Sequence, residues 1–233
     1  MAVDAVLETA DEAVERGADL LLVHHPLLLR GVSTVAADAP KGRIITDLIK
    51  HDIALLAAHT NADIVRQGTS HELACAAGLM NSVPIIPNSV DPSLGLGRVG
   101  DLPEPVALGD LAERVAGAIP ATASGVRVAG ERGRSITRVA VCGGAGDSLL
   151  EHPAVLDADV YITADLRHHP ASEGRDRHRM GTGPALIDLS HWASEWLWLP
   201  AGAKQLSQLL PDVEIEVSMV RTDPWDFAIA SRP

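Results

Sequence analysis

Histidine and carboxylate side chains follow three short apolar runs of this sequence. Residues 20–23, 53–58 and 185–189 have the length and boundaries of buried strands. The polar side chains that come after these runs are His24 and His25, then His59 and Asp63, and finally His191 and Glu195. In an open α/β sheet, the loops beyond the carboxyl ends of the strands build the ligand site. The three runs therefore predict one polynuclear metal centre.

His191 and Glu195 have the spacing of two ligands on one helical turn. Ser190 is a suitable N-cap, so we expect a helix to start directly after it. Residues four apart lie on one face of that helix, and their donor atoms can converge on one ion. The carboxylate can also bridge two ions. The alternative interpretation is an ordinary histidine–glutamate pair on a solvated helix face.

The other two loops have ordinary interpretations as well. His24 and His25 are adjacent and would face opposite ways in an extended chain, so we expect them to serve different ions after a turn imposed by Pro26. A surface loop that holds two histidines is the alternative. Asn61 and Asp63 are also common turn residues. The shared position of all three loops after a strand favours the metal centre over coincidence.

The charges of these groups indicate what such a centre would bind. Neutral histidines with Asp63 and Glu195 supply two negative charges, whereas two divalent ions carry four positive charges. The surplus positive charge would be met by hydroxide, water or an anionic ligand, so a small anionic substrate is expected. Mixed nitrogen and oxygen ligands suit zinc, iron, manganese or nickel better than calcium.

Two further polar segments give weaker signals. Asp165, His168 and His169 follow an apolar run at residues 160–163, and they either place an acid or base near the same site or form an exposed polar loop. Residues 142–148 are rich in glycine but lack the spacings of both common nucleotide-binding glycine motifs. We expect a tight turn there.

Composition excludes several classes of partner. The 233 residues carry 31 acidic and 19 basic side chains, a formal net charge of -12, without a cluster of lysine and arginine. This disfavours nucleic acid and anionic membranes as partners. No apolar run approaches the roughly 20 residues that span a bilayer. The acidic N-terminal segment and two cysteines outside any C-x-x-C motif lead us to expect a cytoplasmic protein.

Alternating strands and helices predict an α/β fold. Residues 126–129 and 136–141 are expected to form a hairpin, residues 172–183 a loop, residues 190–210 one helix, and residues 213–219 a last strand of alternating burial. The sheets should therefore be mixed. The motif H-x-x-x-D in the first half and H-x-x-x-E in the second suggest two similar lobes.

The chain resembles the GTP cyclohydrolase 1 type 2 homologues, also called NIF-three-like dinuclear-metal proteins. The matching segments are GADLLLVHHPLL, ALLAAHTNAD, GLGRVGDLPEP, VAVCGGAGDSLL, YITADLRHHPASE and ALIDLSHWASEW. The resemblance implies two α/β lobes with mixed sheets flanked by helices, two metal ions in the cleft between them, and a homohexameric ring. Lobe 1 would contain residues 1–90 and 181–233, and lobe 2 residues 91–180.

The resemblance also assigns roles to individual residues. The metal ligands would be His24, His25, Asp63, His191 and Glu195, with Glu195 bridging the ions, while His59 and His169 would line the pocket. The family's T-G-E reads Thr163-Ala164-Asp165 here, which puts the role of Asp165 in doubt. The chain also starts close to the first helix of the family pattern. Residues 20–23 are therefore expected to lack a neighbouring strand.

Two functions of different classes follow. The first is a metal-dependent hydrolase that acts on a small anion such as a nucleotide or another ring amide, with His59 and His169 moving protons or orienting the substrate. The second is a metal-binding scaffold or regulatory protein without turnover. An open coordination position distinguishes them, because catalytic centres keep one and structural centres do not.

Overall fold

The computed structural model describes residues 1–230 and shows a mixed α/β protein, as the sequence predicts. The chain divides into two compact units, each built from discontinuous segments. Unit 1 contains Met1–Ala62 and Leu199–Thr222, and unit 2 contains Asp63–Trp198 and the chain from Asp223 onward. Among residues 1–230, no helix combines the length and apolar character that crossing a bilayer requires.

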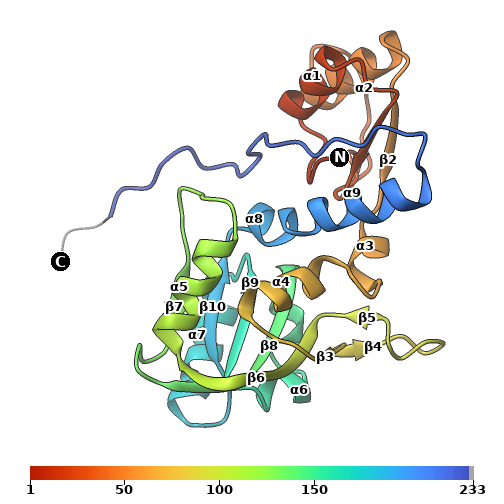
Figure 1. The fold of residues 1–233 in the computed structure, drawn as a ribbon. Coiled ribbons are helices and arrows are strands. Elements are labelled where there is room, and N and C mark those ends of the chain that lie inside the picture. The colour runs from red at the N-terminus through yellow and green to blue at the C-terminus, as the bar shows by residue number, and fades with distance from the viewer. Residues whose placement is uncertain (231–233) are drawn as a thin grey trace. The chain divides into compact units, whose positions relative to one another are not determined.

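Unit 1 is built on a two-stranded parallel sheet. Strands β1 (Leu20–Val23) and β2 (Ala54–Ala57) pair in register along their whole length. Helices α1 (Leu7–Glu15) and α2 (Pro40–Lys50) contact these strands and share one apolar core with them (Figure 1). Because the strands are parallel, their carboxyl ends lie at the same edge. The loops after β1 and β2 therefore start side by side.

The first residues of the chain cover the other edge of β1. Ala2 bridges Val23 in parallel, and its backbone N–H donates to the carbonyl of Leu22 at 2.9 Å. Residues 20–23 are expected from the sequence to lack a neighbouring strand, but they pair with β2, and at this other edge the described residues supply a single bridge and no further strand. Residues 213–219 are not assigned as the expected strand. Instead, the Ser218 N–H donates to the Met1 carbonyl at 2.8 Å, so this extended segment adds to the same edge.

Unit 2 contains a mixed six-stranded sheet with the order β3-β6-β8-β9-β10-β7. The strands are β3 (Ser82–Val83), β6 (Arg98–Ala107), β7 (Arg127–Ala129), β8 (Ser135–Ala145), β9 (Val160–Ala164) and β10 (Ala185–Leu189). Strands β8, β9 and β10 are parallel, and the outer pairs are antiparallel. Every residue of β9 and β10 is buried, as expected for central parallel strands covered on both faces. A separate small hairpin joins β4 (Ile86–Pro87) to β5 (Gly95–Leu96).

The remaining helical segments lie mostly in unit 2, except the last of them, which belongs to unit 1 from Leu199 onward. They are α3 (Thr60–Ile64), α4 (Thr69–Ala77), α5 (Leu108–Ala118), the 3₁₀ turn η1 (Asp147–Leu149), α6 (Pro153–Leu156), α7 (His168–Arg179), α8 (His191–Trp196) and α9 (Trp198–Leu209). Helices α4 and α8 contact β8, and α7 contacts β10 (Figure 1). The glycine-rich segment begins in the last residues of β8, and the carboxyl ends of β9 and β10 lead into the Asp165 loop and α8. These three segments contribute the residues of unit 2 described below.

The structure corrects three expected elements. The hairpin between residues 126–129 and 136–141 does not form, because β7 pairs with β10 at the far edge of the sheet. The polar stretch expected as a loop lies largely in α7, whose buried Gly174 allows close packing on Leu186 of β10. The expected single helix over 190–210 is divided into α8 and α9. Pro200 cannot donate the backbone hydrogen bond that would join them.

The compact units also differ from the expected domain boundaries near residues 90 and 180. The chain changes units after Ala62, after Trp198 and again after Thr222. The second difference has a clear cause, because β10 pairs with β9 on one side and β7 on the other. Residues 185–189 are thus part of the large sheet of unit 2, and only the chain after α8 returns to unit 1.

Candidate metal site

Three histidines form a cluster in unit 1. His24 and His25 follow β1, and His59 follows β2, at the common edge of the parallel pair. The ring centroids are 4.8 Å apart for His24 and His25, 5.2 Å for His24 and His59, and 5.5 Å for His25 and His59. One ring nitrogen of each lies within 4.8 Å of those of the others. Three imidazoles at this separation are a nitrogen donor set suited to a divalent transition metal.

Hydrogen bonds orient two of these rings. His24 is buried, and its Nδ1 lies 3.0 Å from the carbonyl oxygen of Ala58, while Nδ1 of His25 lies 2.7 Å from Oδ1 of Asp4. A carbonyl or carboxylate at this position accepts the proton of Nδ1 and leaves the lone pair on Nε2. Metal-binding histidines are usually held in this way. Both rings therefore present Nε2 as the ligand atom.

Asp4 is a site residue that the sequence analysis missed. Besides His25, its carboxylate accepts a hydrogen bond from the hydroxyl of Thr222. Asp4 precedes α1 and Thr222 ends unit 1, so the two residues are far apart in the chain. No local motif marks either of them. Only the folded arrangement shows that Asp4 holds the His25 ring.

His191 and Glu195 meet in unit 2 as the sequence predicts. The Ser190 side chain caps α8 by accepting the N–H of Ala193 at 3.3 Å. One turn separates His191 from Glu195, and Nε2 of the histidine lies 3.1 Å from Oε1 of the carboxylate. Two ligand atoms of one tetrahedral zinc ion are separated by about 3.4 Å, given metal–ligand distances of about 2.1 Å. The pair is therefore spaced to share an ion.

Asp165 holds the other nitrogen of the same ring. Its Oδ2 lies 2.9 Å from Nδ1 of His191, and its backbone takes the left-handed conformation with φ of 55°. Burial lowers the pKa of His191, but the hydrogen bonds to Asp165 and Glu195 outweigh this and raise that pKa to about 10. The hydrogen bond from His191 lowers the pKa of Asp165. A metal ion at Nε2 would replace the proton that otherwise points to Glu195, while the proton on Nδ1 would stay with Asp165.

Gly144 leaves space for the side chains of His191 and Glu195, and we call this space the Gly144 cradle. The glycine lies within β8, where the pairing with β9 is interrupted between Val141 and Ala145; it has φ of +68°, and its N–H donates to Oγ of Ser194 at 2.9 Å. A Cβ atom at position 144 would come within 2.3 Å of Oε1 of Glu195 and 3.2 Å of Nε2 of His191. Only glycine allows both the conformation and the close approach. The glycine-rich segment is not the expected tight turn over its whole length, because residues 142–145 belong to β8, and Gly144 within it shapes the space around the two donors.

Asp63 lies in the same part of unit 2. Its Oδ1 accepts a hydrogen bond from the Thr69 hydroxyl at 2.7 Å, and Thr69 in turn packs against Gly143. Burial, followed by the charges of Asp63 and Glu195, raises the pKa of the Cys142 thiol to about 12. Both carboxylates are therefore close to Cys142. This thiol stays protonated at neutral pH, so the donors here are imidazole and carboxylate.

The two residues expected to act in proton transfer differ in their surroundings. His59 belongs to the histidine cluster of unit 1. His169 lies in the exposed first turn of α7, where its ring is 5.2 Å from that of His168. The role of each residue remains a prediction. The residues that fit a metal ion are the imidazoles and carboxylates already described, together with the Gly144 cradle.

Comparisons with known proteins agree on one family. A family model described as Duf34/NIF3 (NGG1p interacting factor 3) matches residues 1–224. A Streptomyces coelicolor protein named GTP cyclohydrolase 1 type 2 homolog is 49% identical over 100% of this chain and 82% of its own length. The crystal structure of a Staphylococcus aureus hypothetical protein is 28% identical, with a TM-score of 0.86 over 97% of this chain and 86% of the other. A Bacillus cereus protein related to NIF3, 24% identical over 97% of this chain and 88% of its own, has the same fold with a TM-score of 0.86.

Proposed function

Because the chain belongs to the Duf34/NIF3 family, we propose that it binds two divalent metal ions and uses them in hydrolysis. The ligands in this proposal are His24, His25, Asp63, His191 and Glu195, with Glu195 bridging the ions. His24, His25 and His191 would supply three imidazoles, and Asp63 and Glu195 would supply two carboxylates. The mixed donor set favours zinc, iron, manganese or nickel.

One observation carries the proposal furthest: the fixed position of His191. Its ring lies between Asp165 and Glu195, and Gly144 leaves room for the ring and the carboxylate. An ordinary surface pair needs neither a second carboxylate on Nδ1 nor a glycine against Oε1. Outer carboxylates that orient a histidine are typical of metal sites. The His24 and His25 rings, held through Nδ1, support the same interpretation.

The proposed chemistry is the activation of water toward a small anionic substrate. Two divalent ions in such a site lower the pKa of bound water and polarise phosphoryl or carbonyl oxygens. Asp63 and Glu195 are the only acidic residues among the proposed ligands, so an oxygen of hydroxide or of an anionic substrate would complete the coordination, while the Asp4 and Asp165 carboxylates contact the far nitrogens of the His25 and His191 rings. His59 would take or return a proton close to the ligands, and His169 would orient the substrate. A nucleotide satisfies the charge requirement, and the name of the Streptomyces coelicolor relative makes GTP the first compound to test.

A screen for turnover tests this proposal. Purified protein loaded separately with zinc, iron, manganese and nickel is incubated with GTP and other nucleotides, and loss of substrate is followed by chromatography. We expect substrate loss with the wild type and a decrease of about 100-fold in Glu195→Gln, which removes the bridging charge. Glu173→Gln, in exposed α7, is the matched control and should keep full activity.

The same screen separates the enzyme from its rival, a metal-binding scaffold or regulatory protein without turnover. A fully metallated sample that leaves every nucleotide intact would support the scaffold.

The resemblance also leads us to propose a homohexamer, for which light scattering should give a mass about six times 24.5 kDa.

A further inference from the structure

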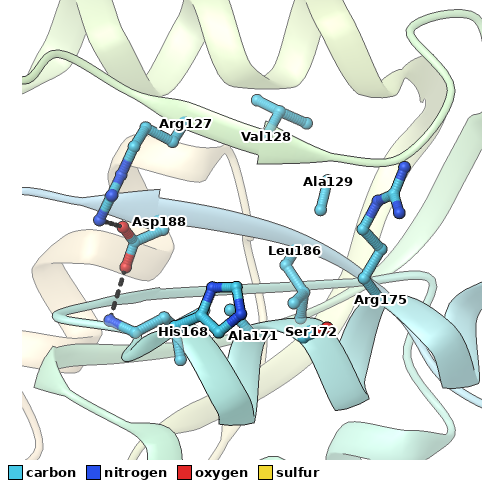
Figure 2. A pocket seen from close by; sticks show the side chains of 10 residues that line it. Arg127, Val128, Ala129, His168, Ala171, Ser172, Arg175, Leu186 and Asp188 are labelled. Carbon is cyan, nitrogen blue, oxygen red and sulfur yellow. Dashed lines mark hydrogen bonds and ion pairs between the residues drawn. The ribbon is translucent and has the colours of Figure 1, made fainter.

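Unit 2 has a cavity that contains none of the proposed metal ligands. It lies between β7, β10 and the first turns of α7, and its volume is about 520 Å³. Sites for small organic molecules usually have volumes of about 300–1,000 Å³. Figure 2 shows Arg127 and Arg175 on opposite sides of this cavity, with Leu186 and His168 between them.

Basic side chains dominate the polar part of the cavity. Arg127, Arg175 and His168 line it, with Asp188 as the single acid among the lining residues. The Asp188 carboxylate is satisfied within the wall, since one oxygen accepts the N–H of Leu166 at 2.9 Å and the other pairs with Arg127. Within residues 1–230, Arg175 forms no ion pair. The cavity therefore presents an exposed guanidinium without a bound carboxylate.

Arg127 can also contact a ligand while it holds Asp188. A guanidinium has five N–H donors, and the contact with Asp188 engages NH2 only. The Arg127 side chain is 65% exposed, whereas that of Asp188 is 9% exposed. The charge of Arg127 thus faces the open side of the cavity. Two guanidinium groups around one cavity are suited to carboxylate or phosphate oxygens.

The rest of the wall is apolar. Val128 and Ala129 of β7, Leu186 of β10 and Ala171 of α7 lie between the two arginines (Figure 2). A simple inorganic anion would leave this surface exposed to water. An organic anion would cover it and gain the free energy of apolar burial in addition to the charge contacts.

We propose that this cavity binds a small organic anion, with its carboxylate or phosphate at the arginines and its apolar body against Val128 and Leu186. The proposal rests on the cavity, its charges and its apolar wall, and it does not depend on metal binding. It assigns Arg175 to ligand recognition, a role that the sequence pattern did not indicate.

Titration with a fluorescent organic anion tests the proposal on the full chain. The probe is 8-anilinonaphthalene-1-sulfonate, and its uncharged relative N-phenyl-1-naphthylamine measures the apolar contribution alone. We expect saturable binding of the anion, weakened about tenfold by Arg175→Ala because one charge-assisted contact is lost. Ser172→Trp, which fills the cavity from the exposed face of α7, should weaken both probes.

Arg179→Ala is the matched control, because Arg179 is exposed on the same helix and does not line the cavity. It should bind both probes as the wild type does, and circular dichroism verifies that every variant is folded. Equal affinity of the wild type for the charged and the neutral probe would overturn the assignment of an anion. Wild-type affinity in both Arg175→Ala and Ser172→Trp would overturn the cavity as the binding site.

Discussion

Oδ2 of Asp165 lies 2.9 Å from Nδ1 of His191, so a carboxylate orients the ring of this proposed metal ligand through the nitrogen that does not face Glu195. This contact gives a role to the acid that the sequence left in doubt. Asp165 follows β9 and His191 follows β10, and these two parallel strands are neighbours. The relationship therefore depends on strand order, and it is a direct target for mutation.

Asp165→Asn should weaken metal binding without unfolding the protein. Asparagine tolerates the left-handed backbone at this position, but it no longer favours a proton on Nδ1. We expect the metal affinity to fall by about 10–100-fold, as is usual for losses of an orienting carboxylate. Competition with a chelator of known affinity measures this change. Asp110→Asn, at an exposed site on α5, should bind metal like the wild type.

In the metal-free protein, Asp165 should contribute more to the free energy of unfolding near pH 6, where His191 is protonated, than near pH 10. The folded-state pKa of His191 is raised from 6.5 to about 10, so its contribution to stability is present below pH 6.5 and is lost as the pH rises through about 10. The pKa of Asp165 is lowered, so its contribution is lost as the pH falls below its ordinary value of 3.8.

Urea unfolding of the metal-free wild type and Asp165→Asn measures this dependence. The difference in free energy of unfolding should be larger at about pH 6 than at about pH 10. A nuclear magnetic resonance titration should also place the pKa of His191 lower in the variant. An equal difference at both pH values would argue against the ion pair.

Gly144→Ala should reduce metal content and stability together. The new methyl group would come within 2.3 Å of Oε1 of Glu195, and alanine would be strained at φ of +68°. We expect a loss of about 1–3 kcal/mol in the free energy of unfolding. Gly133→Ala is the control, since a Cβ atom there meets nothing within 4 Å. The free energy of unfolding and the metal content should therefore be lower in Gly144→Ala than in Gly133→Ala. Similar values in the two variants would show that Gly144 has no role in the site.

Asp4→Asn tests whether the N-terminal carboxylate positions His25. The amide can no longer favour the proton on Nδ1 of His25 through a charge-assisted hydrogen bond, so we expect metal affinity to fall by about 10–100-fold. Asp19→Asn, at another exposed position of unit 1, provides the comparison. Isothermal titration with zinc would measure both, and unchanged affinity in Asp4→Asn would exclude the positioning role.

The sequence predicts the local parts of the site well. Strand ends after Val23 and Leu189 could be identified from apolar runs, and Ser190 identifies the start of α8 by its capping side chain. The spacing of His191 and Glu195 follows from helix geometry. All these features depend on neighbours within a few residues, which sequence patterns record directly.

Features that depend on distant parts of the chain could not be predicted. Asp4 contacts His25 across 21 positions, and Asp165 contacts His191 across 26. The pairing of β7 with β10 is also non-local, and it replaces the hairpin that adjacency suggested. Helix α7 was missed because its residues are mostly polar and its packing on β10 depends on the buried Gly174.

Metal analysis of the purified protein tests the central claim most directly. Inductively coupled plasma mass spectrometry would compare the wild type with three variants of proposed ligands, His25→Ala, Asp63→Ala and His191→Ala, and the exposed His51→Ala would serve as control. We predict about two equivalents of metal in the wild type and the control, and a sharp decrease in all three ligand variants. Metal content that is unchanged in the three ligand variants would contradict the proposed centre.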